Sequence, residues 1–202
     1  MIGRHDHPEV SLHSFSLAEY MKSIDAGDWA GVAKLMLRSA EKLAKAGADF
    51  LICPDNTIHQ AFDLVEHRSP RPWLHIAREV GAEGKVRGQK RLGVLGTKYL
   101  MEGPVYREAL KAAGIEQRVP SAEQRGRINA IIFDELVNGQ FLPRSLAYFV
   151  ELIRRMKDEG CDAVVLGCTE IPLLVSEEDS PLPILDSTRL LARAAVRKAM
   201  EG

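Results

Sequence analysis

Two stretches of the sequence place an ionisable side chain directly after a short apolar run. Cys168 follows the run Val164–Gly167, and Asp55 follows the run Phe50–Pro54. Short apolar runs with β-branched members are typical of buried strands, and open α/β sheets bind ligands at the carboxyl ends of their strands. A thiol and a carboxylate at such positions could each remove or deliver a proton.

The pattern around these two residues occurs twice in the chain. A shift of 113 residues lays Gly47–Ile58 onto Gly160–Ile171, and this register pairs Asp55 with Cys168. The preceding helices agree, because apolar residues at helical spacing fall on one another: Met36, Ala40 and Leu43 on Phe149, Ile153 and Met156. We therefore expect two similar halves that bring Asp55 and Cys168 to opposite walls of one cleft.

The three cysteines have different interpretations. Cys53 and Cys161 lie within or beside apolar runs, where cysteine is usually a small core residue. Cys168 follows Gly167 and precedes an expected helix start, where backbone N–H groups can lower the pKa of a thiol. Cys168 is therefore the candidate functional thiol.

Asp55 also has a purely structural interpretation as the N-cap of an expected helix. Its register with Cys168 favours chemistry instead, since two ionisable groups at equivalent turns could remove a proton from one face of a carbon and deliver it to the other. Donors that suit a substrate carboxylate, and that could equally cap helices, come from Asn56, Thr57, Thr97 and Thr169.

Other polar clusters have weaker functional signals. The run His5-Asp6-His7 resembles a metal-ligand set, but such runs near a terminus are more often solvated, and we predict no metal. His59 and His75 are interpreted as pocket-wall or core residues. The Gly93–Thr97 stretch has neither the Walker spacing nor the dinucleotide fingerprint, so it does not indicate a nucleotide site.

Composition places the chain among ordinary globular proteins. It has 202 residues, 46% of them hydrophobic and 27% charged, with a net charge of −1. No apolar run is long enough to span a membrane, no signal-peptide core is present, and no basic block suggests nucleic acid. We expect a cytoplasmic protein with three free thiols and a small-molecule ligand.

Strand and helix patterns alternate along the chain, which indicates an α/β fold with parallel sheets flanked by helices. We expect two lobes related by pseudo-two-fold symmetry, residues 1–88 with 187–202 and residues 89–186, the first lobe being short by a strand and a helix. Expected strands are Val10–Phe15, Phe50–Cys53, Pro72–Ile76, Arg91–Thr97, Ile115–Val119, Val164–Leu166 and Pro183–Leu185. Expected helices include Trp29–Ala46, Asp55–His67, Ala109–Ala113, Glu123–Val137, Arg144–Glu159 and one begun by Asp186-Ser187-Thr188.

At the two reactive turns the chain resembles the aspartate/glutamate racemase superfamily of cofactor-independent amino-acid racemases. Ile52–His59 is similar to its first motif, a catalytic residue followed by Asn-Thr-x-His, and Leu166–Ile171 is similar to its second, Gly-Cys-Thr-Glu. The resemblance extends over the whole chain, and it implies two proton-transferring residues on opposite sides of the substrate Cα, without pyridoxal phosphate or metal, in a homodimer. Cys168 matches the second catalytic cysteine. Asp55 occupies the position of the first, and the family's opening strand with its Gly-Gly turn is absent.

The leading hypothesis is a racemase or epimerase in which Asp55 and Cys168 form an unequal two-base pair. An acidic substrate such as aspartate or glutamate could place its side-chain carboxylate on Lys98 or Arg4, and Glu170 is grouped with the substrate-binding residues. Two alternatives remain open. One is a lyase or decarboxylase of the same fold that uses Cys168 alone as proton donor, and the other is a truncated, non-catalytic relative that binds a small acid.

Overall fold

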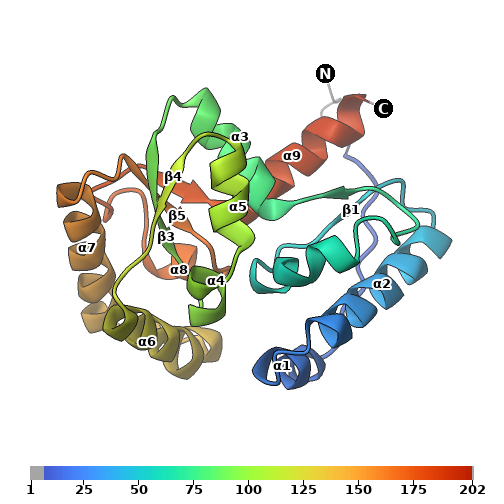
Figure 1. Cartoon of the computed structure of the whole chain (residues 1–202), viewed down its shortest axis with the longest axis horizontal. Helices are drawn as coiled ribbons and strands as arrows, with labels where there is room; N and C mark the ends of the chain where they lie inside the picture. The colour runs from blue at the N-terminus through green and yellow to red at the C-terminus, as the bar shows by residue number, and fades with distance from the viewer. Residues whose placement is uncertain (1–6, 202) are drawn as a thin grey trace.

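A computed structural model describes residues 7–201, which form an α/β structure with two parallel sheets (Figure 1). Within this range no helix combines the length and the apolar character needed to cross a membrane. In chain order the elements are α1 (Leu17–Asp25), α2 (Trp29–Lys45), β1 (Leu51–Ile52), η1 (Thr57–Leu64), β2 (Trp73–Leu74), α3 (Ile76–Val86), β3 (Arg91–Leu95), α4 (Lys98–Glu102), α5 (Val105–Ala112), β4 (Glu116–Arg118), α6 (Ala122–Ala130), η2 (Ile131–Glu135), η3 (Leu136–Asn138), α7 (Pro143–Asp158), β5 (Ala163–Leu166), α8 (Ile171–Leu174), β6 (Ile184–Asp186) and α9 (Ser187–Glu201).

The larger sheet has four parallel strands in the order β4-β3-β5-β6. Leu95 pairs with Leu166 at the carboxyl ends of the two central strands, and β4 lies at one edge, as its polar residues predict. Side chains alternate between the two faces of a strand, so Val94 and Val165 belong to one core cluster and Leu95 and Leu166 to the other.

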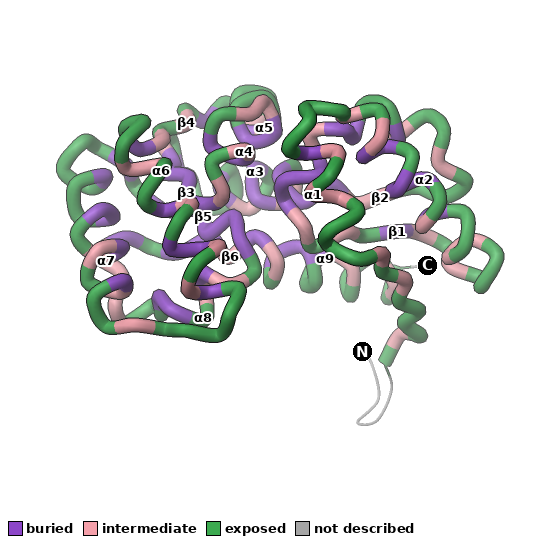
Figure 2. The backbone as a smooth tube through the Cα atoms, turned by 90° about the horizontal axis from the view of Figure 1, so that it is seen from below, coloured by how far each residue is buried: buried purple, intermediate pink, exposed green. Residues whose placement is uncertain are grey.

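Helices cover both faces of this sheet (Figure 1). The core on one face includes residues of α3, α5 and α9, and the core on the other face includes residues of α6, α7 and α8. Figure 2 shows the purple buried backbone concentrated in the strands and on the inward sides of these helices. Burial on both faces explains why β3 and β5 are almost uninterrupted apolar runs.

The smaller sheet consists of β1 and β2, with Leu51 paired to Trp73. Helix α2 packs on η1, and both contribute to a separate apolar core that includes Val32, Met36, Leu37 and Phe62. In Figure 1 this part of the chain, coloured blue to teal, lies beside the larger sheet. Two parallel sheets are therefore present, as the sequence predicts.

The internal repeat has a clear local counterpart. Gly47 and Gly160 both follow the helix that leads to a strand, and both have positive φ angles, 98° and 88°. A left-handed residue at this position ends a helix and favours glycine. The lobe boundaries, the symmetry axis and the homodimer remain predictions. Helix α3, which the sequence places in the first lobe, contributes Ala77 and Val80 to the core of the larger sheet.

The expected strand at Val10–Phe15 does not form, so that prediction is wrong. Residues 7–16 have no regular secondary structure, and the side chains of Val10 and Leu12 are almost fully exposed. The segment is held by side-chain contacts to α2 instead: His13 Nδ1 lies 3.0 Å from Ser39 Oγ, and Arg38 lies over the ring of Phe15. Alternating polarity alone does not distinguish such a segment from a strand.

Other expected elements differ in type or length. The helix expected over Asp55–His67 is a 3-10 helix, η1, and the helix expected over Glu123–Val137 is α6 followed by the π-helical turn η2 and the 3-10 turn η3. Helices α1 and α4 were not expected at all. Three of these elements, α1, η1 and η2, border the cavity described next.

Candidate active site

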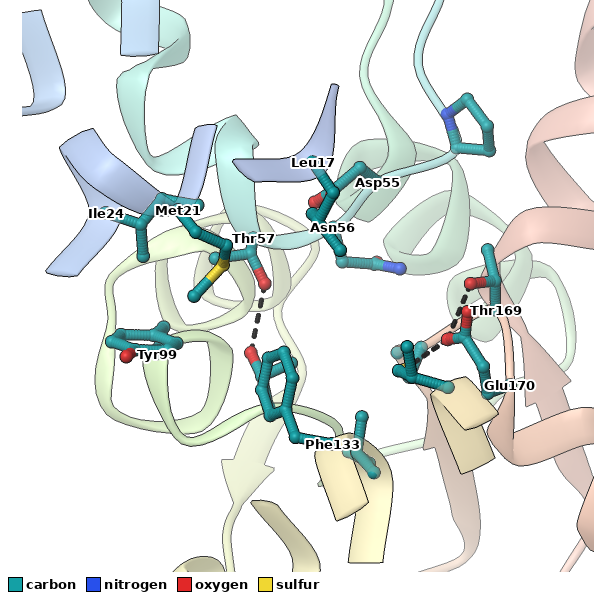
Figure 3. A pocket seen from close by; sticks show the side chains of 16 residues that line it. Leu17, Met21, Ile24, Asp55, Asn56, Thr57, Tyr99, Phe133, Thr169 and Glu170 are labelled. Carbon is teal, nitrogen blue, oxygen red and sulfur yellow. Dashed lines mark hydrogen bonds between the residues drawn. The ribbon is translucent and has the colours of Figure 1, made fainter. Parts of the chain in front are cut away.

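A cavity of about 210 Å³ lies at the carboxyl ends of β1, β3 and β5 (Figure 3). It is closed on other sides by α1 and by the η2–η3 segment. The position agrees with the expectation that ligands bind where strands end. The lining residues are Leu17, Met21, Ile24, Pro54, Asp55, Asn56, Thr57, Thr97, Tyr99, Ile132, Phe133, Val137, Gly167, Cys168, Thr169 and Glu170.

Two glycines set the backbone at the ends of the central strands. The Gly167 N–H donates to Leu95 O over 2.7 Å, which extends the sheet pairing by one residue. A Cβ on Gly167 would lie 2.6 Å from Leu100 Cδ2, and a Cβ on Gly96 would lie 2.9 Å from Gly167 O. The turn that presents Cys168 therefore packs so closely on the end of β3 that neither position accepts a side chain without movement.

The Cys168 thiol is buried and donates a hydrogen bond to Glu170 Oε2 over 2.9 Å. The Thr169 hydroxyl donates to the same oxygen over 2.7 Å. Burial, followed by the negative charge and the hydrogen bond of Glu170, raises the pKa of Cys168 far above its ordinary value.

The prediction that a helix start lowers the pKa of Cys168 is therefore wrong. Helix α8 begins only at Ile171 and is a single turn, whereas the Glu170 carboxylate lies in direct contact with the thiol. Desolvation and a nearby negative charge both favour the neutral thiol, so Cys168 rests as a proton donor.

Asp55 lies in the same cavity as Cys168, on the loop between β1 and η1. Its Oδ1 accepts a hydrogen bond from the Ile58 N–H over 3.1 Å, so the capping interaction expected for Asp55 is present. Burial raises the pKa of Asp55 despite this bond, and the negative charge of Glu170 raises it further. Capping and chemistry are compatible at this residue, because one carboxylate oxygen is sufficient for the cap.

The next residue, Asn56, connects the two sheets. The Tyr106 hydroxyl donates to Asn56 Oδ1 over 2.7 Å, and Asn56 Nδ2 donates to Ser187 Oγ over 3.0 Å. Ser187 Oγ in turn donates to Leu166 O, the last residue of β5. These bonds hold the Asp55 loop against the end of β5. They use one of the two amide hydrogens of Asn56, and the other is available to a ligand.

Thr57 and Thr97 form a hydroxyl pair at the wall of the cavity, with their Oγ1 atoms 3.0 Å apart (dashed line in Figure 3). Thr97 Oγ1 also accepts from the Leu100 N–H and so caps α4. Whichever hydroxyl donates within the pair, the other keeps its hydrogen for a ligand. The pair can therefore donate one hydrogen bond to a carboxylate.

Several candidate residues are not brought to the cavity. The Lys98 side chain is exposed, and its ammonium lies 5.0 Å from the centroid of the Tyr99 ring rather than along the lining. Arg4, His5 and Asp6 lie outside the described residues. Within residues 7–201 no cluster of three or more His, Cys, Asp or Glu could hold a metal ion.

The other two cysteines, together with His59 and His75, lie in or against the apolar cores. Cys161 is buried in the core of the larger sheet, and Cys53 packs against the core that includes α2. His59 and His75 contact each other edge to face, and burial lowers their pKa values to about 4 and about 3. Neither histidine lines the cavity, so the core interpretation of these four residues agrees with the structure.

Sequence reasoning missed the apolar half of the cavity. Helix α1 contributes Leu17, Met21 and Ile24, and the η2–η3 segment contributes Phe133 and Val137. A signal was available for α1: Ser16 accepts a hydrogen bond from the Ala18 N–H as its N-cap, and the three apolar residues follow at i, i+4 and i+7. No comparable signal marks the π-helical turn η2.

The fold and the paired turns define the class: an α/β protein with a candidate active site at the carboxyl ends of its parallel strands. The sequence profile of the Asp/Glu/Hydantoin racemase family matches residues 1–195, and the chain belongs to this family. The broad specificity amino-acid racemase RacX of Bacillus subtilis (strain 168) is 25% identical over 192 residues, which cover 95% of this chain and 82% of RacX.

Solved structures agree with this assignment. An aspartate racemase homologue from Pyrococcus horikoshii OT3 is 30% identical with a TM-score of 0.85, over 98% of this chain and 87% of that protein. A Yersinia pestis protein assigned to the Asp/Glu racemases is 33% identical with a TM-score of 0.90, over 98% of this chain and 86% of that protein.

Proposed function

We propose that the protein is an amino-acid racemase or epimerase in which Asp55 and Cys168 exchange the Cα proton of the substrate. The observation that carries the proposal is that both side chains line one cavity, at equivalent turns after β1 and β5. Family membership and the similarity to a broad-specificity racemase support the same reaction class.

The neutral state of the Cys168 thiol suggests an order of events, in which Asp55 acts in its ionised form. The Asp55 carboxylate takes the Cα proton, and the C–H bonding pair is delocalised into the substrate's α-carboxylate. The Cys168 thiol then gives its proton to the opposite face of Cα and becomes a thiolate. Transfer of the proton from Asp55 back to Cys168 through water completes the cycle, with no cofactor taking part.

The α-carboxylate must be held while negative charge develops on it. The second amide hydrogen of Asn56 and the remaining hydrogen of the Thr57–Thr97 pair are suited to this role. Hydrogen bonds from donors that are already fixed by other contacts stabilise a developing charge without reorganisation. Asn56 is fixed by Tyr106 and Ser187, so its amide meets this condition.

Glu170 has a different role in this proposal from the substrate-binding role expected of it. For the reverse reaction Cys168 must act as a base and must first lose its proton. Glu170 Oε2 already accepts a hydrogen bond from Cys168 Sγ over 2.9 Å and can take that proton. Glu170 is thus proposed to position the thiol and to share its proton.

Chiral chromatography of a panel of amino acids incubated with the protein tests the proposal. At least one pure enantiomer is expected to give its mirror image, and Cys168→Ser is expected to abolish this conversion because a serine hydroxyl is far too weakly acidic to replace the thiol. Serine is nearly isosteric and can still donate to Glu170, so the melting temperature serves as the control. Conversion by Cys168→Ser within about threefold of the wild type would remove Cys168 from the mechanism.

A further inference from the structure

The cavity has two chemically different sides (Figure 3). Thr169 and Glu170 lie on one side, with Asp55 and Asn56 beside them, and Met21, Ile24, Tyr99 and Phe133 lie on the other, with the Thr57 hydroxyl among them. If the reacting Cα lies between Asp55 and Cys168, with its carboxylate on the Asn56 amide, the substrate side chain extends toward the second side. That side therefore selects the substrate.

The selecting side is built from apolar side chains of two separate elements. Helix α1 provides Leu17, Met21 and Ile24, while Phe133 and Val137 come from the η2–η3 segment. Leu17 and Val137 remain about half exposed, at 52% and 45%. A ligand that covers them would remove apolar surface from water, which favours binding.

The charges at the cavity oppose an acidic side chain. Among the described lining residues the ionisable carboxylates are Asp55 and Glu170, and no lysine or arginine is present. The Tyr99 hydroxyl donates to Asp25 Oδ1 over 2.7 Å and is not free for a ligand. Beside these negative groups a second substrate carboxylate would lose water without a cationic partner among residues 7–201, and this is costly.

We infer that the substrates of this site are amino acids with an apolar side chain of about the size of leucine, rather than aspartate or glutamate. The inference rests on the proposed function for the position of Cα. It differs from the acidic substrate expected from the sequence, for which Lys98 was one candidate partner; the other candidate, Arg4, lies outside the described residues.

Leucine and aspartate make a matched pair for the test, because both side chains branch at Cγ into two atoms of similar size. Deuterium incorporation at Cα from heavy water is measured for each amino acid, together with its equilibrium binding by calorimetry. Leucine is expected to exchange and to bind at least about tenfold better than aspartate. Exchange or binding that favours aspartate would overturn the inference and leave the racemase proposal standing.

The two measurements separate the two claims. Leucine binding that is preferred over aspartate, with no exchange of any amino acid in the panel, would support the apolar site and refute the racemase. Failure of both amino acids to bind would overturn the inference, and failure of every amino acid in the panel to exchange would refute the racemase as well.

A charge placed on the apolar side gives a second test in the same protein. Met21→Lys puts an ammonium group on the cavity-facing side of α1 and is expected to reduce the preference for leucine over aspartate by about tenfold or more. Met200→Lys introduces the same change on the exposed end of α9, away from the cavity, and is expected to leave the preference unchanged. An unchanged preference in Met21→Lys, with a melting temperature close to the wild type, would contradict the inferred position of the side chain.

Discussion

Cys168 and Glu170 form a thiol–carboxylate pair, with Cys168 Sγ 2.9 Å from Glu170 Oε2. The pair explains why Cys168 is a proton donor at rest, because a carboxylate in contact with a buried thiol disfavours its ionisation. Asp55, on the loop after β1, supplies the second proton-transferring group of the cavity in our proposal. The two groups differ in chemistry, and the predictions below depend on that difference.

Glu170→Gln is expected to lower the pKa of Cys168. Burial is the larger cause of the raised pKa and stays in place, but the charge of Glu170 also raises it and is removed by the substitution. The thiolate should therefore appear at lower pH in the variant, as measured by its ultraviolet absorbance. Cys53 and Cys161 also titrate, so the same scan on Cys168→Ser provides the background; an identical titration of wild type and Glu170→Gln would contradict the pair.

Asp55→Asn is expected to abolish racemisation while substrate binding and stability are kept. Asparagine caps a helix about as well as aspartate and can still accept from the Ile58 N–H, but it cannot transfer a proton. Asp55→Cys is expected to raise racemase activity, since it restores a matched pair of thiols, and to cost on the order of 1 kcal/mol in stability.

Turnover and melting temperature of the two Asp55 variants separate the alternatives. If Asp55 only caps η1, Asp55→Asn should be silent and Asp55→Cys should only destabilise. A reaction that needs Cys168 alone, such as decarboxylation, should survive Asp55→Asn. Unchanged racemisation in Asp55→Asn would refute the two-base proposal.

Gly167→Ala is expected to destabilise the protein by about 1–3 kcal/mol and to impair catalysis. The added Cβ would lie 2.6 Å from Leu100 Cδ2 and 3.1 Å from Leu95 O, so the turn that presents Cys168 must move. Gly126→Ala in α6 is the matched control, because its Cβ would meet nothing within 4 Å and alanine favours a helix. Urea unfolding of both variants measures the difference, and equal stability would contradict the close packing of the turn.

The stability of the protein is expected to fall as the pH decreases below about 6.5. His59 and His75 are buried in the neutral form, with pKa values lowered to about 4 and about 3, so the unfolded chain binds protons first. Each histidine then lowers the free energy of unfolding by about 1.4 kcal/mol for every unit of pH decrease between its pKa in the unfolded chain and its pKa in the folded protein. The raised pKa of Asp55 acts in the opposite direction and reduces the net loss.

His75→Asn isolates one of these contributions. His75 Nδ1 accepts from the Ala77 N–H and caps α3, a role that asparagine can take over. The variant is expected to lose less free energy of unfolding than the wild type between pH 7 and pH 5. Equal losses in the two proteins would show that His75 does not contribute.

The repeat could be read from the sequence because its signals are local. Gly47 and Gly160 end their helices in the left-handed conformation, and the apolar runs after them form β1 and β5. The positions of Asp55 and Cys168 at strand ends follow directly, and both line the cavity. Residue types at fixed spacing were sufficient for these features.

The errors arose where an outcome depends on contacts between distant segments. Val10–Phe15 alternates in polarity like a strand. Its Val10 and Leu12 side chains are exposed, and only side-chain contacts such as that of His13 with Ser39 join it to α2. The pKa of Cys168 depends on burial and on the orientation of Glu170, neither of which is visible in the spacing. Lys98 follows Thr97 directly in the chain, yet its side chain points outward at the start of α4.

The central claim is that Cα is deprotonated on one face and reprotonated on the other. Its most direct test follows deuterium from heavy water into Cα, starting from each pure enantiomer of leucine and of the other amino acids in the panel. We predict that wild-type protein produces the opposite enantiomer with deuterium at Cα from both starting forms, and that Asp55→Asn and Cys168→Ser do not. If wild-type protein incorporates no deuterium into any amino acid of the panel, the claim is contradicted.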